Sequence, residues 1–109
     1  MICEIDEFLL IVQNWITDSA AVMFSLILFD APKAPVLGVR LRGRIGTIDK
    51  QVPAFTFVSG EESFIVVDLT TWSQVGYADS SAYPEGEQVK EGFVIARPGA
   101  SIAIWALLP

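Results

Sequence analysis

The chain has 109 residues, a length that favours a single domain with one hydrophobic core. Apolar residues make up 52% of it and charged residues only 18%, so we expect self-association to cover part of its apolar surface. Acids outnumber bases by 13 to 7, which gives a net charge of −6. This charge disfavours general binding to DNA or RNA, because such binding depends on Lys and Arg.

The chain contains no histidine and one cysteine, Cys3. The absence of histidine excludes His–Asp and Cys–His catalytic pairs and histidine metal ligands. A single cysteine excludes an internal disulfide. An enzyme would depend on carboxylates alone, and the acidic residues at 61–62 and 85–91 fall mainly in expected turns. We therefore expect no metal, no cofactor and no enzymatic activity.

Residues 4–16 predict an amphipathic helix. Their apolar side chains recur at three- and four-residue spacing, and acids occupy the first turn, where the helix dipole favours negative charge. The apolar face consists of Ile5, Phe8, Leu9, Val12, Trp15 and Ile16, and the acids are Glu4, Asp6 and Glu7.

The apolar span 8–29 has the length of a membrane helix, about 20 residues. However, Asp18 falls in its middle, and a central Asp costs about 2.5–3.5 kcal/mol on membrane insertion. We interpret the span as a helix and a strand separated by a turn. The acidic start also differs from the basic start of a secretory signal, so we expect a cytoplasmic protein with no membrane partner.

From about residue 21 the pattern is that of β-strands joined by short turns. A run at 22–29 is apolar except for Ser25, and the segment 36–48 alternates and carries glycines that predict bends. We expect one domain over residues 1–109, mainly β with one N-terminal helix, folded as a small, strongly bent antiparallel barrel, with a sandwich as the alternative. The remaining expectations are a loop at 30–35, a mobile loop at 79–88, and strands at 55–57, 64–69, 93–96 and 101–107. The strand at 64–69 is expected to extend through 70–77.

Arg40, Arg42 and Arg44 share one face of the long alternating strand. A row of guanidinium groups could bind phosphate or an acidic partner. Alternatively, it is an exposed strand face balanced by nearby acids, or a set of charges that blocks aggregation. We favour this second interpretation of the basic patch.

Three tryptophans differ in their surroundings. Trp15 and Trp105 lie in apolar segments and are predicted to be core residues. Trp72 lies in a polar stretch, so we expect it to be exposed, and exposed Trp often marks a contact surface.

The segment 42–55 resembles the first half of the motif of Sm and Sm-like proteins. In that motif a glycine-containing strand leads into a turn with an Asp, and Gly43, Ile45 and Asp49 match it. Pro53 stands where the family carries Asn.

The segment 93–102 resembles the second half of the same motif, in which a hydrophobic strand ends in Arg-Gly. Arg97 and Gly99 flank an additional proline, and Ile102 begins the last strand. The resemblance implies an N-terminal helix followed by a strongly bent five-stranded barrel. The stretch 55–93 is longer than that barrel needs, so we expect an extra hairpin or long loop.

The resemblance also implies candidate RNA contacts at Asp49, Gln51, Arg97 and Gly99. In RNA-binding members a base stacks on a side chain of the first turn, as aromatic side chains commonly allow. Here Gln51 is not aromatic, and Pro53 has no polar side-chain group. We therefore expect the barrel of the family to be retained, and the pocket that binds a base in RNA-binding members to lack the side chains that it needs.

Sm-like rings form when the fourth strand of one barrel pairs with the fifth strand of its neighbour. The resemblance therefore implies an oligomer interface at Phe93, Ile95, Ile102 and Ile104. The leading hypothesis is a non-enzymatic Sm-like barrel that self-assembles, as a ring scaffold with weak or absent RNA binding. The alternative is a structural or adaptor subunit of a larger protein assembly.

Overall fold

The computed structural model describes residues 2–30 and 34–109. In this part of the chain one helix precedes seven antiparallel strands, which confirms the predicted mainly β fold with an N-terminal helix. The elements are α1 (Ile5–Thr17), β1 (Val22–Asp30), β2 (Ala34–Asp49), β3 (Ala54–Ser59), β4 (Ser63–Asp68), the 3-10 helix η1 (Leu69–Thr71), β5 (Gln74–Tyr77), the 3-10 helix η2 (Ser80–Ala82), β6 (Val89–Arg97) and β7 (Ala100–Leu107).

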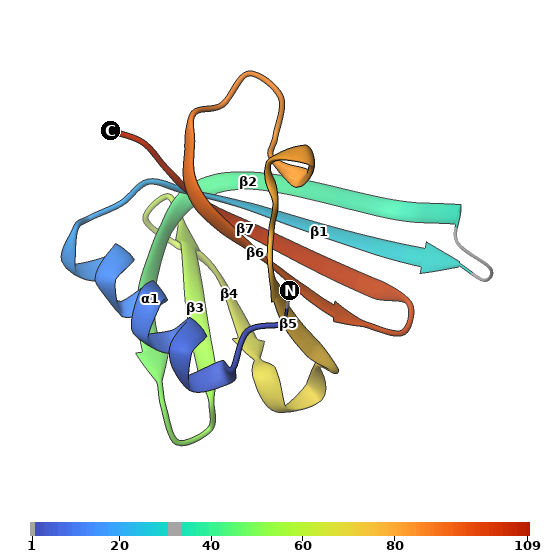
Figure 1. The fold of residues 1–109 in the computed structure, drawn as a ribbon, viewed down its shortest axis with the longest axis horizontal. Helices are drawn as coiled ribbons and strands as arrows, with labels where there is room; N and C mark the ends of the chain where they lie inside the picture. The colour runs from blue at the N-terminus through green and yellow to red at the C-terminus, as the bar shows by residue number, and fades with distance from the viewer. Residues whose placement is uncertain (1, 31–33) are drawn as a thin grey trace.

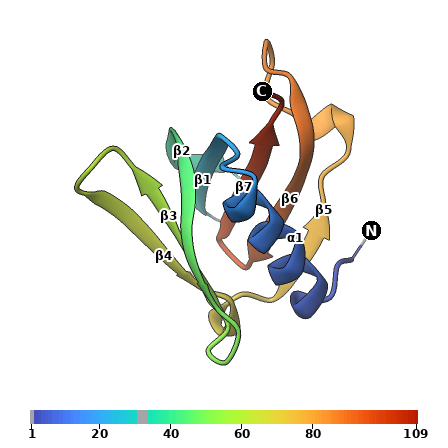
Figure 2. The same ribbon diagram turned by 90° about the vertical axis from the view of Figure 1, so that its left-hand side faces the viewer.

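All strands belong to one sheet with the order β4-β3-β2-β1-β7-β6-β5. The sheet curls strongly into a half-barrel (Figure 1). Helix α1 lies in its hollow, between the half that contains β3 and the half that contains β6 (Figure 2). The loop expected at 30–35 overlaps the start of β2 at Ala34, and residues 31–33 lie outside the described part of the chain.

The long strand β2 joins the two halves of the sheet. It pairs with β1 up to Gly43 and with β3 from Arg44 onward. An ideal Cβ on Gly43 would lie 2.0 Å from the carbonyl oxygen of Val58, so only glycine lets the β3 backbone approach this closely. The β2–β3 register shifts between Ile45 and Thr47, around Gly46. Both glycines therefore fall at the predicted bend.

The core lies between α1 and the concave face of the sheet. Phe8 is fully buried and touches both halves: its ring centroid is 5.7 Å from that of Phe55 on β3 and 4.9 Å from that of Phe93 on β6. Trp15 lies further along the same face of the helix, and its ring centroid is 5.8 Å from that of Phe93. The helix thus holds the two halves of the curled sheet together. The apolar face predicted for the helix is the buried one.

Helix α1 ends in a Schellman turn. The backbone N–H of Ser19 donates to the carbonyl of Ile16, and the N–H of Ala20 donates to the carbonyl of Trp15. Ser19 has φ of 52°, the left-handed conformation that this turn requires. The helix and β1 are therefore separate elements, as the sequence predicted, and no helix in the described residues is both long and apolar enough to cross a bilayer.

The segment 79–88, predicted to be a mobile loop, folds over the convex face of the sheet. Its Tyr83 packs on a small buried cluster formed by Met23, Trp105 and Leu107. Its Glu87 forms an ion pair with Arg42 on β2. These contacts anchor the loop to the strands beneath it.

The expected extension of the 64–69 strand through residue 77 is wrong. The Asp68 carboxylate accepts hydrogen bonds from the backbone N–H of Thr70 at 2.9 Å and from its hydroxyl at 2.6 Å. These bonds cap η1 and turn the chain away, and they lower the pKa of Asp68. The chain then crosses below the hollow to form β5, at the opposite edge of the sheet from β4.

Candidate assembly surface

Strand β4 is an open edge of the sheet. It pairs with β3 over its whole length, and no other strand of the described chain pairs with its far side. Side chains alternate along it, with Val67 buried and Phe64 and Val66 facing outward with 67% and 58% of their surface exposed. Free backbone N–H and C=O groups beside exposed apolar side chains are a template for another strand.

The usual protections of an edge strand are missing from β4. Its register with β3 runs from Ala54 opposite Asp68 to Ser59 opposite Ser63 without a bulge. It contains no proline and no lysine, and its one charge, Asp68, stands at its last position. An apolar, regular edge of six residues is therefore available for pairing.

The opposite edge, β5, is better protected. It has only four residues, and the N-terminal segment covers part of it: Ile2 forms a bridge with Gly76, and the N–H of Cys3 donates to the carbonyl of Val75 at 2.8 Å. Short and covered edges resist pairing with other chains. The two ends of the sheet therefore differ in their capacity to bind a partner strand.

A second open edge lies on the first half of β2. This half pairs with β1 on one side, whereas β3 pairs only with the second half. The β1–β2 hairpin consequently projects from the body as an arm (Figure 1). Leu37 and Val39 on this arm expose 52% and 36% of their surface.

The residues that the resemblance implied for the oligomer interface lie in the core instead. Phe93, Ile95, Ile102 and Ile104 are each at most 3% exposed. Their strands pair with each other, and each has a second neighbour inside the chain, β5 for β6 and β1 for β7. Neither strand has a free edge at these residues, so the pairing of the fourth and fifth strands that the resemblance implied is not available there.

The candidate RNA contacts come from two different turns. The Asp49 carboxylate accepts hydrogen bonds from the N–H groups of Gln51 at 2.9 Å and Val52 at 3.2 Å, so it shapes its own turn. Gly99 lies in the β6–β7 turn with φ of 81°, and its carbonyl accepts from the N–H of Phe29. Gln51 itself is exposed.

Trp72 and Arg97 form a contact beside the second of these turns. The Arg97 guanidinium lies over the Trp72 ring, 5.7 Å from its centroid. Trp72 is half-buried and packs against the core, so it is less exposed than predicted. The Arg97 cation is thus stacked on a neighbouring aromatic ring.

The three arginines of β2 lie on its convex face and are exposed, as the alternation predicted. Arg40 lies over the ring of Trp105 at 5.7 Å, and Arg42 pairs with Glu87. Two of the three guanidinium groups therefore have partners inside the chain, and one of these partners is an acid.

Cys3 lies in a buried position beside Tyr77 and Glu7. Only 3% of Cys3 is exposed, and its sulfur lies 3.9 Å from a Glu7 carboxylate oxygen. Burial, helped by the neighbouring acids, raises the pKa of the Cys3 thiol. The group is consequently a weak nucleophile at neutral pH, because the thiolate is the reactive form.

We predict that Cys3 resists alkylation in the folded chain. Iodoacetamide at pH 7.5 should modify it at least about tenfold more slowly than in chain unfolded by urea, because folding both buries the thiol and disfavours its thiolate. Mass spectrometry of timed samples measures both rates. Equal rates would show that Cys3 is accessible, contrary to its burial beside Glu7 and Tyr77.

Among the described residues no group of three or more Cys, Asp or Glu side chains is arranged to hold a metal ion. No family model matches the chain, and no curated protein or solved structure matches it significantly. The geometry of the sheet edges is therefore the main indication of what this protein does. The alternation at Phe64 and Val66 is visible in the sequence. The position of β4 at the end of the sheet is not.

Proposed function

We propose that this protein is a non-enzymatic β-sheet module that acts by joining copies of itself through open sheet edges. The observation that carries this proposal is the regular, unprotected edge of β4 with Phe64 and Val66 exposed beside it. Pairing with a second chain would satisfy the free backbone groups and remove apolar surface from water in one step.

The side chains of β4 suit a partner strand of the same kind. In an antiparallel pair of β4 strands, Phe64 and Val66 of both copies lie on one face, and Ile65 and Val67 lie on the other. Cross-strand pairs between aromatic and β-branched residues contribute about 0.2–1 kcal/mol each. The high apolar fraction of the chain, 52%, is consistent with such burial.

Two forms of assembly differ in which edges meet. A contact between β4 and β4 is isologous and stops at a dimer. A contact between β4 and the arm edge of β2 is heterologous, and it forms a ring where the rotation between neighbouring copies closes and an open filament where it does not. The resemblance to the Sm motif supports the ring, with its contacts shifted to edges other than those the motif implies.

The test is solution mass by light scattering at low and moderate salt. We expect the unmodified chain to form one closed oligomer at both salt concentrations, because the contact is apolar. Val66→Lys should shift the chain to monomer. The protein concentration at which half of the oligomer dissociates should be at least tenfold higher than for the unmodified chain. Leu10→Lys is the matched control, since Leu10 is 57% exposed on α1, away from both edges, and should keep the mass unchanged.

Leu37→Lys on the arm separates the two forms. In a ring it should dissociate the oligomer as Val66→Lys does, whereas in a β4–β4 dimer it should have no effect. A monomeric unmodified chain would contradict the proposal. It would favour the alternative of a subunit that pairs with other proteins.

A further inference from the structure

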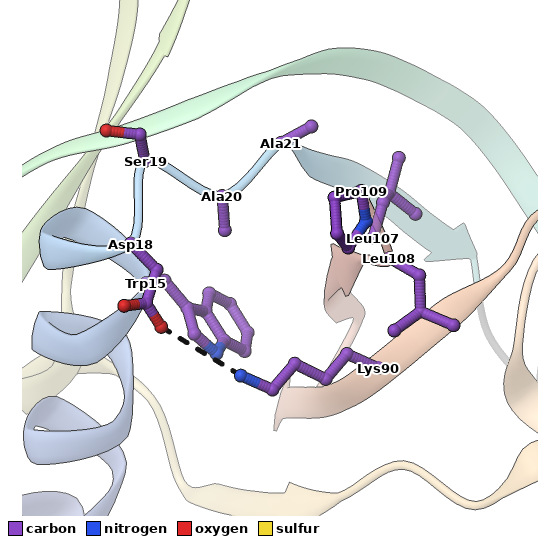
Figure 3. A pocket seen from close by; sticks show the side chains of 9 residues that line it. All are labelled: Trp15, Asp18, Ser19, Ala20, Ala21, Lys90, Leu107, Leu108 and Pro109. Atoms are coloured by element: carbon purple, nitrogen blue, oxygen red, sulfur yellow. Dashed lines mark ion pairs between the residues drawn. The ribbon is translucent and has the colours of Figure 1, made fainter.

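A pocket of about 420 Å³ opens at the end of α1, away from the β4 edge. Its walls come from the last turn of the helix, the Schellman turn, β6 and the end of the chain (Figure 3). Its apolar lining residues include Ala20, Ala21, Leu107 and Leu108, together with the small exposed part of Trp15. This volume falls within the range of about 300–1,000 Å³ typical of small-molecule sites, which combine apolar walls with few polar groups.

Two charged groups face each other across the mouth of this pocket. The Lys90 ammonium lies 3.9 Å from an Asp18 carboxylate oxygen, and their side chains are 53% and 58% exposed. An ion pair this long and this exposed holds its partners weakly. Lys90 is also flexible, so its ammonium can move into solvent without leaving an uncompensated buried charge.

The other fixed charges around the pocket are negative. Asp18 is the C-cap of α1, and the last turn of the helix carries no basic residue to balance the negative end of its dipole. Glu91 lies beside the pocket and accepts a hydrogen bond from the Trp15 indole N–H at 2.7 Å. That bond occupies the indole donor, so Trp15, which is only 2% exposed, offers the pocket a small apolar contact and no polar one.

We infer that this pocket binds a small organic ammonium ion with an apolar ring. The ring lies against Trp15, the two alanines and Leu108, and the ammonium replaces that of Lys90 at the Asp18 carboxylate. The Asp18–Lys90 pair shows that this carboxylate accepts an ammonium group at the mouth of the pocket. A ligand anion would instead face Asp18 and the negative end of α1, with Lys90 as the one cation among the residues that line the pocket.

The test compares two probes with the same ring and chain but opposite charge, tryptamine and indole-3-propionate. Two-dimensional amide NMR of the full chain reports binding through shifts of the residues that line the pocket and of the Trp15 indole N–H. We expect tryptamine to bind at least about fivefold more tightly than indole-3-propionate. Asp18→Asn should weaken tryptamine binding about three- to fivefold, in the range of an exposed ion pair.

Lys90→Met keeps the apolar stem and removes the competing charge, so it should tighten tryptamine binding about threefold. Glu85→Gln and Lys50→Met are matched controls for the change in net charge, because both residues are exposed and neither lines the pocket. The spectrum of each variant also shows whether it remains folded. Tighter binding of indole-3-propionate, equal binding of both probes, or no effect of either pocket variant would overturn the inference, as would the absence of shifts at the pocket.

Discussion

Replacing Phe8 by alanine should destabilise the fold by about 3–5 kcal/mol, the range for a large aromatic residue removed from a core. Phe8 has no exposed surface, and it makes edge-to-face contacts with Phe55 on one half of the sheet and Phe93 on the other. The substitution therefore leaves a cavity where α1 joins the two halves. Domains of this size have stabilities of about 5–15 kcal/mol, so urea denaturation followed by circular dichroism should show a large loss.

The matched control for this prediction is Leu10→Ala on the same helix. Leu10 is 57% exposed, so its truncation should change the free energy of unfolding by no more than about 0.5 kcal/mol. A similar loss in both variants would contradict the difference in burial between Phe8 and Leu10, because alanine is the best helix former and neither loss could come from helix propensity. A loss below 1 kcal/mol for Phe8→Ala would contradict the placement of α1 in the hollow.

Gly43→Ala should destabilise the fold by about 3 kcal/mol, at the upper end of the usual range for overpacking. The added Cβ would lie 2.0 Å from the Val58 carbonyl oxygen and 2.9 Å from its carbon, and both atoms belong to the backbone of β3. A backbone carbonyl in a sheet cannot rotate away as a flexible side chain can. The β3–β4 hairpin would have to separate from β2, and its buried Phe55 and Phe57 would lose their packing.

Gly38→Ala is the control, because Gly38 lies on the same strand and a Cβ there would meet no atom within 4 Å. We expect no loss of stability at this position, and a small gain is consistent with the lower backbone entropy of alanine in the unfolded chain. Equal effects of the two substitutions in urea denaturation would contradict the close β2–β3 approach.

Local patterns in the sequence predicted most of the elements. The spacing of Phe8, Val12 and Trp15 predicted the buried face of α1, because a helix brings every third or fourth residue to one side. The alternation of arginines with apolar residues predicted which face of β2 is exposed. Glycines predicted where β2 bends, and Asp18 predicted where the helix ends before β1 begins.

The errors concern contacts between distant segments. The sequence pattern extends the preceding strand through the segment 70–77, whereas Asp68 turns the chain there and β5 forms at the other edge of the sheet. The interface implied for Phe93 and Ile102 depended on strand order, and β6 and β7 are interior strands. A strand's side-chain pattern does not reveal how many neighbours it has, because hydrogen bonds between strands involve the backbone, which is the same for nearly all residues.

The sequence by itself determined the helix, the position and alternation of most strands, the low content of charged residues and the negative net charge. Only the tertiary structure decided that β4 and the arm of β2 are open edges, and that Trp15, Asp18 and Lys90 meet at one pocket. The physical reason is that periodicity expresses local backbone geometry, whereas edges and pockets arise from how segments far apart in the chain pack against one another.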